Sequence, residues 1–303
     1  MVRAAARNNV MDYSYPAGGR YANADPGLSG PRDSVFSMCG RYSVSIPTTD
    51  LMAEFQVDDV FDGLPGPDYN VAPTVSVPAI FERRVKTEEA EPAPVRRRLA
   101  PLVWGLVPSW AKERSIGSRM INARLETVAE KPAFRKAFGA RRCLLPADGF
   151  YEWYAGEAVP PASGRGRPKP IKQPFFIHRA DGQALVMAGI YEIWRDPTKP
   201  RDDDSAWLRS CAVITTRATD AAGHIHDRMP MVIARDAVDA WLDPTLTDPD
   251  RALALLAVTE ADALAAYAVS TEVNSVQNNH PGLKEPVPAE EGITPAPVQE
   301  KLL

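Results

Sequence analysis

The sequence predicts a mixed α+β domain in which strands outnumber helices. Short runs of apolar and β-branched residues are frequent, helical patterns are few, and the two do not alternate regularly. A doubly wound parallel sheet is therefore not expected. The 303 residues, 45% hydrophobic and 24% charged, have ordinary globular proportions, and no internal repeat is visible. We predict a single domain over residues 38–280.

The predicted elements start at Cys39, where CGRYSVSI is typical of a strand. The next segment, TTDLMAEFQV, predicts a helix with Thr48 or Thr49 as its N-cap. A Pro/Gly loop then leads into a strand at 76–81. Further strands are expected at 102–108, 142–154, 174–178, 184–194, 211–216 and 229–233, and helices at 127–138, 236–242 and 250–258.

Five segments lack the composition of a packed core. Residues 1–37 are rich in Ala, Gly, Asn, Ser and Pro, and we expect them to be disordered or absent from the mature protein. The segments 83–98, 155–172 and 195–205 are Pro-rich or charged and predict surface insertions. Residues 281–303 are expected to form a disordered tail.

Cysteine content and hydropathy indicate the compartment. The three cysteines form no C-x-x-C pair, so a disulfide framework or a structural zinc site is not expected, and a reducing cytoplasm fits best. No run approaches the roughly 18 apolar residues of a membrane-spanning helix. The first residues also lack the apolar stretch of a secretory signal. We expect a cytoplasmic protein that does not contact membranes.

The charge is distributed unevenly along the chain. The net charge of −4 does not favour nucleic-acid binding. From Lys112 to Arg142, however, the chain has nine Lys or Arg residues and only three Asp or Glu residues. Between Asp220 and Asp262 this balance is reversed, with three basic and nine acidic residues. A locally basic strip can bind phosphates on an acidic protein, although it is equally typical of an ordinary solvated surface.

Reactive side chains concentrate in four short segments: MCGRY at 38–42, INARLE at 121–126, FYEW at 150–153 and HIHDRMP at 224–230. Each has a simple structural alternative. A single Cys near a strand start often packs in a core, and strand alternation would place Glu152 opposite Tyr151 and Trp153, facing solvent. His224 and His226 share a strand face, but no Cys or carboxylate cluster completes a zinc site. We therefore expect no metal and no cofactor.

Taken together, the motifs resemble the SRAP family (SOS response-associated peptidase) of abasic-site processing proteins. The resemblance covers about residues 38–280 and is carried by seven motifs in the same order. These motifs are MCGRY, YNVAP (69–73), WGLVPSW (104–110), INAR-ET (121–127), RCLLPADGFYEW (142–153), QPFFI (173–177) and IHDRMP (225–230). The resemblance implies a mostly antiparallel, barrel-like β core with a few flanking helices.

The resemblance also implies roles for individual residues. Cys39 matches the nucleophile, which in the family is the N-terminal residue, and Asn122 matches a residue that positions the Cys amine and the substrate. Glu152 and His226 match an acid/base pair. Residues expected to contact DNA are Arg41, Arg124, Asn70, Pro73 and Trp110, of which the first two match phosphate contacts and the last two match groups that stack on or wedge between bases. The implied partner is single-stranded DNA containing an abasic site, bound by a monomer as part of the DNA-damage (SOS) response.

An N-terminal Cys suits this substrate because it carries two nucleophiles on adjacent carbons. Its amine condenses with the ring-opened sugar aldehyde to an imine, and its thiol then closes a five-membered thiazolidine. A carboxyl group can transfer the amine or ring-oxygen proton, and an imidazole changes charge near neutral pH. The imine would also permit β-elimination, so we expect a weak lyase activity, and the family name implies a peptidase acting on its own N-terminus.

The position of the nucleophile departs from the family pattern. Cys39 is internal in this sequence, and an amide nitrogen is not nucleophilic because it is delocalised. Either the first residues are removed or translation begins at Met38. We prefer the second explanation, because Met38 directly precedes Cys39 and a small second residue favours removal of the initiator Met.

Two other functions remain open from sequence. A cysteine peptidase or amidase would use Cys39 and His226, with Asp227 or Glu152, and needs a thiolate–imidazole pair but no free amine. A non-catalytic binding module for single strands would use only the basic strip and Trp110.

Overall fold

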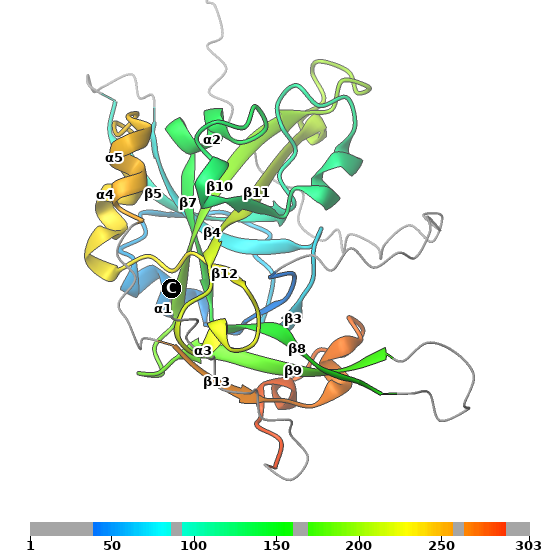
Figure 1. The fold of residues 1–303 in the computed structure, drawn as a ribbon. Coiled ribbons are helices and arrows are strands. Elements are labelled where there is room, and N and C mark those ends of the chain that lie inside the picture. The colour runs from blue at the N-terminus through cyan, green and yellow to red at the C-terminus, as the bar shows by residue number, and fades with distance from the viewer. Residues whose placement is uncertain (1–38, 86–92, 160–168, 257–263, 289–303) are drawn as a thin grey trace, which may run out of the picture.

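The computed structural model describes residues 39–85, 93–159, 169–256 and 264–288 and contains two β-sheets (Figure 1). The five-stranded sheet has the order β13-β9-β8-β1-β3, and the eight-stranded sheet runs β12-β11-β10-β7-β4-β5-β2 with β6 paired to β11. The strands are β1 Tyr42–Val44, β2 Asp59–Val60, β3 Asp68–Val71, β4 Ser76–Arg84, β5 Val95–Trp104, β6 Asn122–Arg124, β7 Arg142–Ala147, β8 Gly149–Val159, β9 Lys169–Arg179, β10 Leu185–Arg195, β11 Trp207–Arg217, β12 Arg228–Pro230 and β13 Leu264–Ala268.

The larger sheet closes on itself. Strand β11 pairs with β5 in parallel at Ser210↔Val103 and Cys211↔Trp104, which joins β4, β5, β11, β10 and β7 into a ring. Most other pairings are antiparallel. The predicted α+β class with a mostly antiparallel, barrel-like core is therefore confirmed.

The barrel separates two hydrophobic cores because strand residues alternate between its faces. Inward residues such as Leu102, Cys143 and Cys211 form one core, to which the five-stranded sheet contributes Tyr42 and Phe150. Outward residues form the second core, which is covered by helices. The helices are α1 Thr48–Glu54, α2 Arg135–Ala140, α3 Asp220–Gly223, α4 Val238–Leu242 and α5 Pro249–Ala254, and the 3-10 helices are η1 Arg114–Arg119, η2 Leu125–Thr127, η3 Asp204–Ala206, η4 Arg235–Ala237, η5 Thr271–Asn274 and η6 Pro281–Lys284.

Two helix predictions were wrong in detail. The helix expected at 127–138 begins only at Arg135, because Pro132 disfavours helical geometry in the residue before it and removes a backbone donor. Neither Thr48 nor Thr49 caps α1, since Pro47 occupies the N-cap position and no side-chain cap bond forms.

The predicted insertions were also partly wrong. Residues 83–84 and 95–98 lie in β4 and β5, and residues 155–159 and 169–172 extend β8 and β9. These strand ends are rich in charged residues and proline, so their composition predicted surface insertions instead of strands. The remaining parts of these two insertions, 86–92 and 160–168, lie outside the described residues, as does the predicted N-terminal extension 1–37.

The predicted start of the disordered tail, at residue 281, was wrong. Residues Pro281–Lys284 form η6, Leu283 is fully buried, and Pro286 makes a β-bridge with Val269. The packed chain therefore extends beyond residue 280, and the rest of the predicted domain division stays a prediction. Within the described ranges, no helix combines the length and apolarity needed to cross a membrane.

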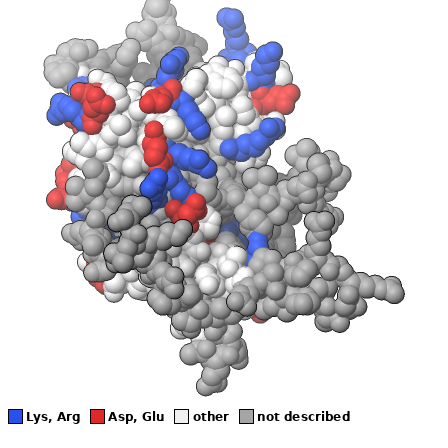
Figure 2. All heavy atoms as spheres, viewed as in Figure 1, with Lys and Arg blue, Asp and Glu red and all other residues white. Residues whose placement is uncertain are grey.

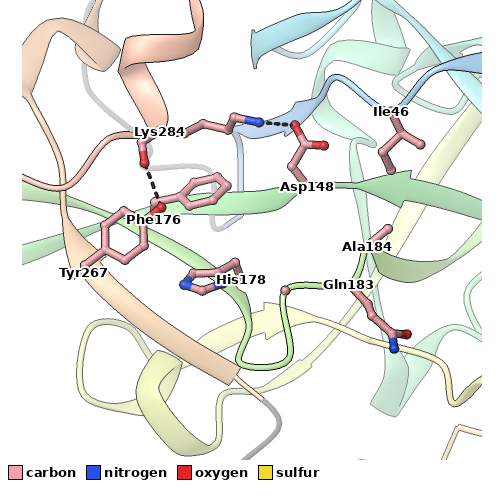
Figure 3. A pocket seen from close by; sticks show the side chains of 9 residues that line it. Ile46, Asp148, Phe176, His178, Gln183, Ala184, Tyr267 and Lys284 are labelled. Atoms are coloured by element: carbon pink, nitrogen blue, oxygen red, sulfur yellow. Dashed lines mark hydrogen bonds and ion pairs between the residues drawn. The ribbon is translucent and has the colours of Figure 1, made fainter.

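Asp148 connects η6 to the start of β8. Its Oδ2 accepts hydrogen bonds from Ser43 Oγ at 2.7 Å and Ser45 Oγ at 2.8 Å, and it lies 2.8 Å from Lys284 Nζ (Figure 3). The pair borders an open cavity of about 320 Å³, which is also lined by His178 and Tyr267. Burial raises the pKa of Asp148, but Lys284 and the serine hydroxyls outweigh burial, so the pKa is lowered overall.

Replacing Asp148→Asn should lower the free energy of unfolding by about 2 kcal/mol at pH 7, because Lys284 is left half-buried without its counter-charge. A carboxylate with a lowered folded-state pKa stabilises the fold above its unfolded pKa and loses that effect as pH falls through the folded pKa. The difference measured by urea unfolding should therefore shrink below about pH 4. Asp62→Asn, at an exposed aspartate, is the control, and an equal loss in both variants would contradict the role of the pair.

Candidate functional site

Cys39 lies where the two sheets meet. Its backbone nitrogen donates to Glu152 Oε1 at 2.6 Å on β8, and its Sγ donates to the backbone oxygen of Arg228 at 3.5 Å on β12. Cys39 is 4% exposed, and so is Glu152. The nitrogen and the sulfur of this residue are thus held by different sheets.

The register of β1 and β8 explains this arrangement. Tyr42 pairs with Phe150 and Ser43 with Gly149, so extending the antiparallel register backwards brings the residues before Tyr42 alongside Glu152. Phe150 belongs to the inner core, and Glu152, two residues later, points to the same side. The alternative of a solvent-facing Glu152 is therefore wrong.

Burial controls the charges in this site. Desolvation raises the pKa of Glu152, although the nearby His226 and the bond from Cys39 partly oppose it. Desolvation also raises the pKa of the Cys39 thiol well above its ordinary value, and the Glu152 carboxylate adds to this effect, whereas the Arg228 charge lowers the pKa. The thiol is thus mainly protonated at neutral pH in this structure.

Arg228 is a site residue to which the sequence motifs assigned no role. Its Nη1 and Nη2 bind the carboxylate of Glu126 at 2.5 and 3.0 Å, and its Nη2 also donates to Thr215 O at 2.7 Å. These bonds fix β12, whose carbonyl accepts from the Cys39 thiol. The only sequence signal was its place in the IHDRMP motif.

His226 lies in the turn before β12 with its ring about one-quarter exposed. The backbone nitrogen of Arg228 donates to its Nδ1 at 3.1 Å, which assigns the proton of the neutral ring to Nε2. Asp227 Oδ1 is also 3.0 Å from Nδ1, but this carboxylate is 82% exposed and is free to turn to solvent.

Strand β6 carries two of the predicted residues on one side. Asn122 is partly buried, and its Nδ2 donates to Cys39 O at 3.5 Å. Arg124 is exposed two positions later, while Ala123 between them is fully buried. Strand alternation thus places an exposed cation beside the residue that contacts Cys39.

Arg41 and Asn70 support a neighbouring loop. Arg41 Nη1 donates to Asn70 Oδ1 at 2.5 Å and to Val273 O at 2.9 Å. The Asn70 amide donates to Ser275 O and Asn278 O, both at 2.9 Å. Asn70 is 4% exposed, so its amide is used inside the protein, and its predicted DNA contact stays a prediction.

Pro73 and Trp110 lie on two loops that begin near one end of β5. Pro73 is partly buried, and the following Thr74 donates its N–H to Trp104 O at 2.7 Å. Trp110 is 57% exposed, whereas its neighbour Ala111 is buried and accepts a bond from the Trp194 indole at 2.7 Å. The loop is further fixed by close backbone contact between Gly105 and Gly117, which leaves no room for a Cβ on either residue. Trp110 is thus presented from a rigid loop.

Several cations of the predicted basic strip lack an ion pair within the described ranges. Lys112, Arg114, Arg119, Lys131, Arg135 and Lys136 are all exposed. Figure 2 shows Lys and Arg side chains gathered in the upper half of the face drawn in Figure 1, interspersed with acidic groups. Among the described residues, no group of three or more His, Cys, Asp or Glu side chains is arranged to hold a metal ion.

Comparison with known proteins decides the family. The model for "SOS response associated peptidase (SRAP)" matches residues 38–276. The chain belongs to the SRAP family. Abasic site processing protein YoqW of Bacillus subtilis is 38% identical over 82% of this chain and 99% of its own length. Abasic site processing protein HMCES of Pongo abelii is 30% identical, covering 82% of this chain and 76% of the relative.

Solved structures agree on the SRAP fold. A crystal structure of a protein from Bacteroides thetaiotaomicron superposes with a TM-score of 0.64 at 22% identity, covering 82% of this chain and all of that one. Its low identity supports the fold alone. Four of the sequence motifs meet in this structure, where Cys39, Asn122, Glu152 and His226 lie close together.

Replacing Glu152→Gln should lower the pKa of the Cys39 thiol, because a negative charge that disfavours the thiolate is removed. The pH midpoint of Cys39 alkylation by iodoacetamide, followed by peptide mass spectrometry, should shift to lower pH. Cys143 and Cys211 are fully buried and serve as internal references. Glu113→Gln, at an exposed glutamate, should leave the midpoint unchanged, and an upward shift in Glu152→Gln would refute this account.

Proposed function

We propose that this chain captures abasic sites in single-stranded DNA by forming a covalent thiazolidine through the amine and thiol of Cys39. The observation that supports it is the position of the Cys39 nitrogen, 2.6 Å from a buried carboxyl group. An unpaired buried carboxylate would be costly, so the bond from the Cys39 nitrogen to Glu152 stabilises the fold. The same carboxylate provides a proton acceptor beside this nitrogen.

The C–N bond and the C–S bond form one after the other. The amine attacks the aldehyde carbon, a C–N bond forms, and water leaves to give the imine. The thiol then adds to the same carbon, and its proton passes to the nitrogen. Glu152 takes a proton from the attacking amine and returns it to the departing oxygen, a role suited to a carboxyl whose pKa is raised by burial. His226, through Nε2, is placed to assist ring opening or reversal.

The reaction requires that Cys39 be the first residue of the active form. The backbone supports this requirement, because Cys39 has φ of 50° in the left-handed region. This conformation costs a non-glycine residue about 1–2 kcal/mol through contacts with the neighbouring peptide groups. Without a preceding residue φ is no longer defined, so the strain disappears while the nitrogen keeps its partner.

Exposed groups around the site suit a single strand. We assign exposed Arg124 and partly buried Arg41 to phosphates, and exposed Trp110 to stacking on a base. Pro73 and Asn70 complete the expected contacts. We infer a monomer acting on DNA in the cytoplasm, with weak lyase activity from the imine and self-processing before Cys39 as secondary activities.

The rival cysteine hydrolase has less support. Such an enzyme needs a thiolate paired with an imidazole. Here the thiol donates to the carbonyl of Arg228, and its pKa is raised by burial and by Glu152. These features favour chemistry in which the amine attacks first.

Protein beginning at Cys39 should form an adduct with a single-stranded oligonucleotide that carries one abasic site. The adduct is expected as a shifted band that survives heating on a denaturing gel. Cys39→Ala should abolish the band, and a chain that retains residues 1–38 should give none unless it is processed.

The opposite result is equally clear. Peptide hydrolysis that depends on Cys39, without any DNA adduct, would favour the hydrolase. Mass spectrometry of active protein that finds only chains starting at Met1 would refute the proposal.

Replacing Arg124→Gln should weaken binding to undamaged single strands and reduce the slope of log affinity against log salt by about 0.7, the loss of one phosphate contact. Fluorescence anisotropy at several salt concentrations measures both. Arg201→Gln, at an exposed arginine near the β10–β11 turn, is the matched control. Equal slopes in the two variants would exclude Arg124 from the phosphate contacts.

A further inference from the structure

The barrel has a second end that the proposed reaction does not use. At one end, where β4 begins and β5 finishes, Tyr42 packs against Trp104 in the inner core. Toward the opposite end, the inward positions of β4 and β5 continue as arginines, and Arg209 of β11 lies on the same side beside Leu102. We call this set, Arg83, Arg96, Arg98 and Arg209, the arginine rim.

Strand alternation fixes the direction of these arginines. In β4, Ala79 and Phe81 belong to the inner core, so Arg83 follows on the inner side. In β5, Ala100 and Leu102 place Arg98 and Arg96 inward in the same way. Arg209 precedes the inward Cys211 of β11. The outward Arg97, by contrast, is bound by Glu82 and Asp239.

The described residues neutralise Arg83, Arg96 and Arg98 of the arginine rim only in part. Arg83 lies directly opposite Arg96 in the β4–β5 register, where two like charges destabilise a sheet. Asp58 is 3.6 Å from Arg96 and Asp59 is 3.3 Å from Arg98, but both carboxylates are about 40% exposed, so each ion pair contributes little. Arg83 is exposed and has no ion pair with any described residue.

The ring of Phe61 lies close to two of these cations, Arg98 and Arg209. The guanidinium carbons of Arg98 and Arg209 lie 5.3 and 5.0 Å from the ring centroid of Phe61. Burial raises the pKa of Tyr191 to about 12, while Arg83, Arg141 and Arg209 all oppose this rise. Several guanidinium groups therefore act on one small region.

We infer that the arginine rim binds the phosphate backbone of nucleic acid at a surface separate from the Cys39 site. Its cations come from three adjacent strands, and the register places Arg209 beside Leu102 of β5, six residues or about 20 Å along the strand from Arg96, which suits a polyanion better than one phosphate. The two surfaces lie at opposite ends of β11: Arg209 is six residues, or about 20 Å, from Thr215, the partner of Arg124. The inference rests on the proposed function only for the choice of nucleic acid as the partner.

The chain offers a matched pair of variants. Arg83 and Arg84 are adjacent, exposed and equally charged, but they point to opposite faces of β4. Binding of the full chain to an undamaged 30-nucleotide single strand is measured by fluorescence anisotropy at several salt concentrations. Arg83→Glu should weaken binding about fivefold and reduce the salt slope by about 0.7. Arg84→Glu, which changes the net charge equally, should have a much smaller effect.

Each other outcome overturns the inference. Equal effects of the two substitutions would show a general charge effect, and no effect in either would remove the arginine rim from DNA binding. Binding of polyglutamate in place of DNA, with the same sensitivity to Arg83→Glu, would identify an acidic protein partner instead. The wild-type adduct with an abasic oligonucleotide is scored separately, so its absence would refute the proposed reaction without affecting the comparison of variants.

Discussion

The bond between the Cys39 nitrogen and the Glu152 carboxylate is the interaction on which the site depends. It is made in a buried place, where an unpaired carboxylate would be costly. The antiparallel pairing of β1 with β8 dictates it, because register alone brings the residues before Tyr42 beside Glu152. Asp148 reinforces the same pairing through Ser43, Ser45 and Lys284. The position of Cys39 is thus a consequence of sheet geometry.

Arg228 performs the corresponding task for the second sheet. Its backbone carbonyl accepts from the thiol, its backbone N–H donates to His226, and its guanidinium binds Glu126. Through three different groups, Arg228 therefore contacts the thiol of Cys39, the imidazole of His226 and the carboxylate of Glu126, which follows β6. Neither sheet alone contains the site, because β8 supplies the carboxyl group and β12 supplies the partner of the sulfur. This division explains why the motifs of the SRAP family are spread over almost 200 residues.

The fold class and the long strands could be predicted from sequence, because local alternation carries that information, whereas the short strands β2, β3, β6 and β13 were missed. The roles of Cys39, Asn122, Glu152 and His226 follow from short motifs and stay a prediction. The resemblance implied a barrel-like core, but local patterns could not identify the pairing that closes it, since β11 pairs in parallel with β5 across about 100 residues. The role of Arg228 depends on similarly distant contacts. Segments 83–98 and 281–284 were misassigned because charge and proline content masked strand ends and a buried Leu283. The internal use of the Asn70 amide likewise follows from a loop 200 residues away.

The rigidity of the Trp110 loop has a thermodynamic consequence. Its backbone is fixed by the contact of Gly105 with Gly117 and by the bond from the Trp194 indole to Ala111. An exposed indole on such a loop is preorganised, so little backbone entropy is lost when a flat ring stacks against it. Most of the stacking free energy then remains as affinity. The same stiffness would prevent the loop from adapting to bulky ligands, so a partner that stacks on Trp110 would have to match its geometry.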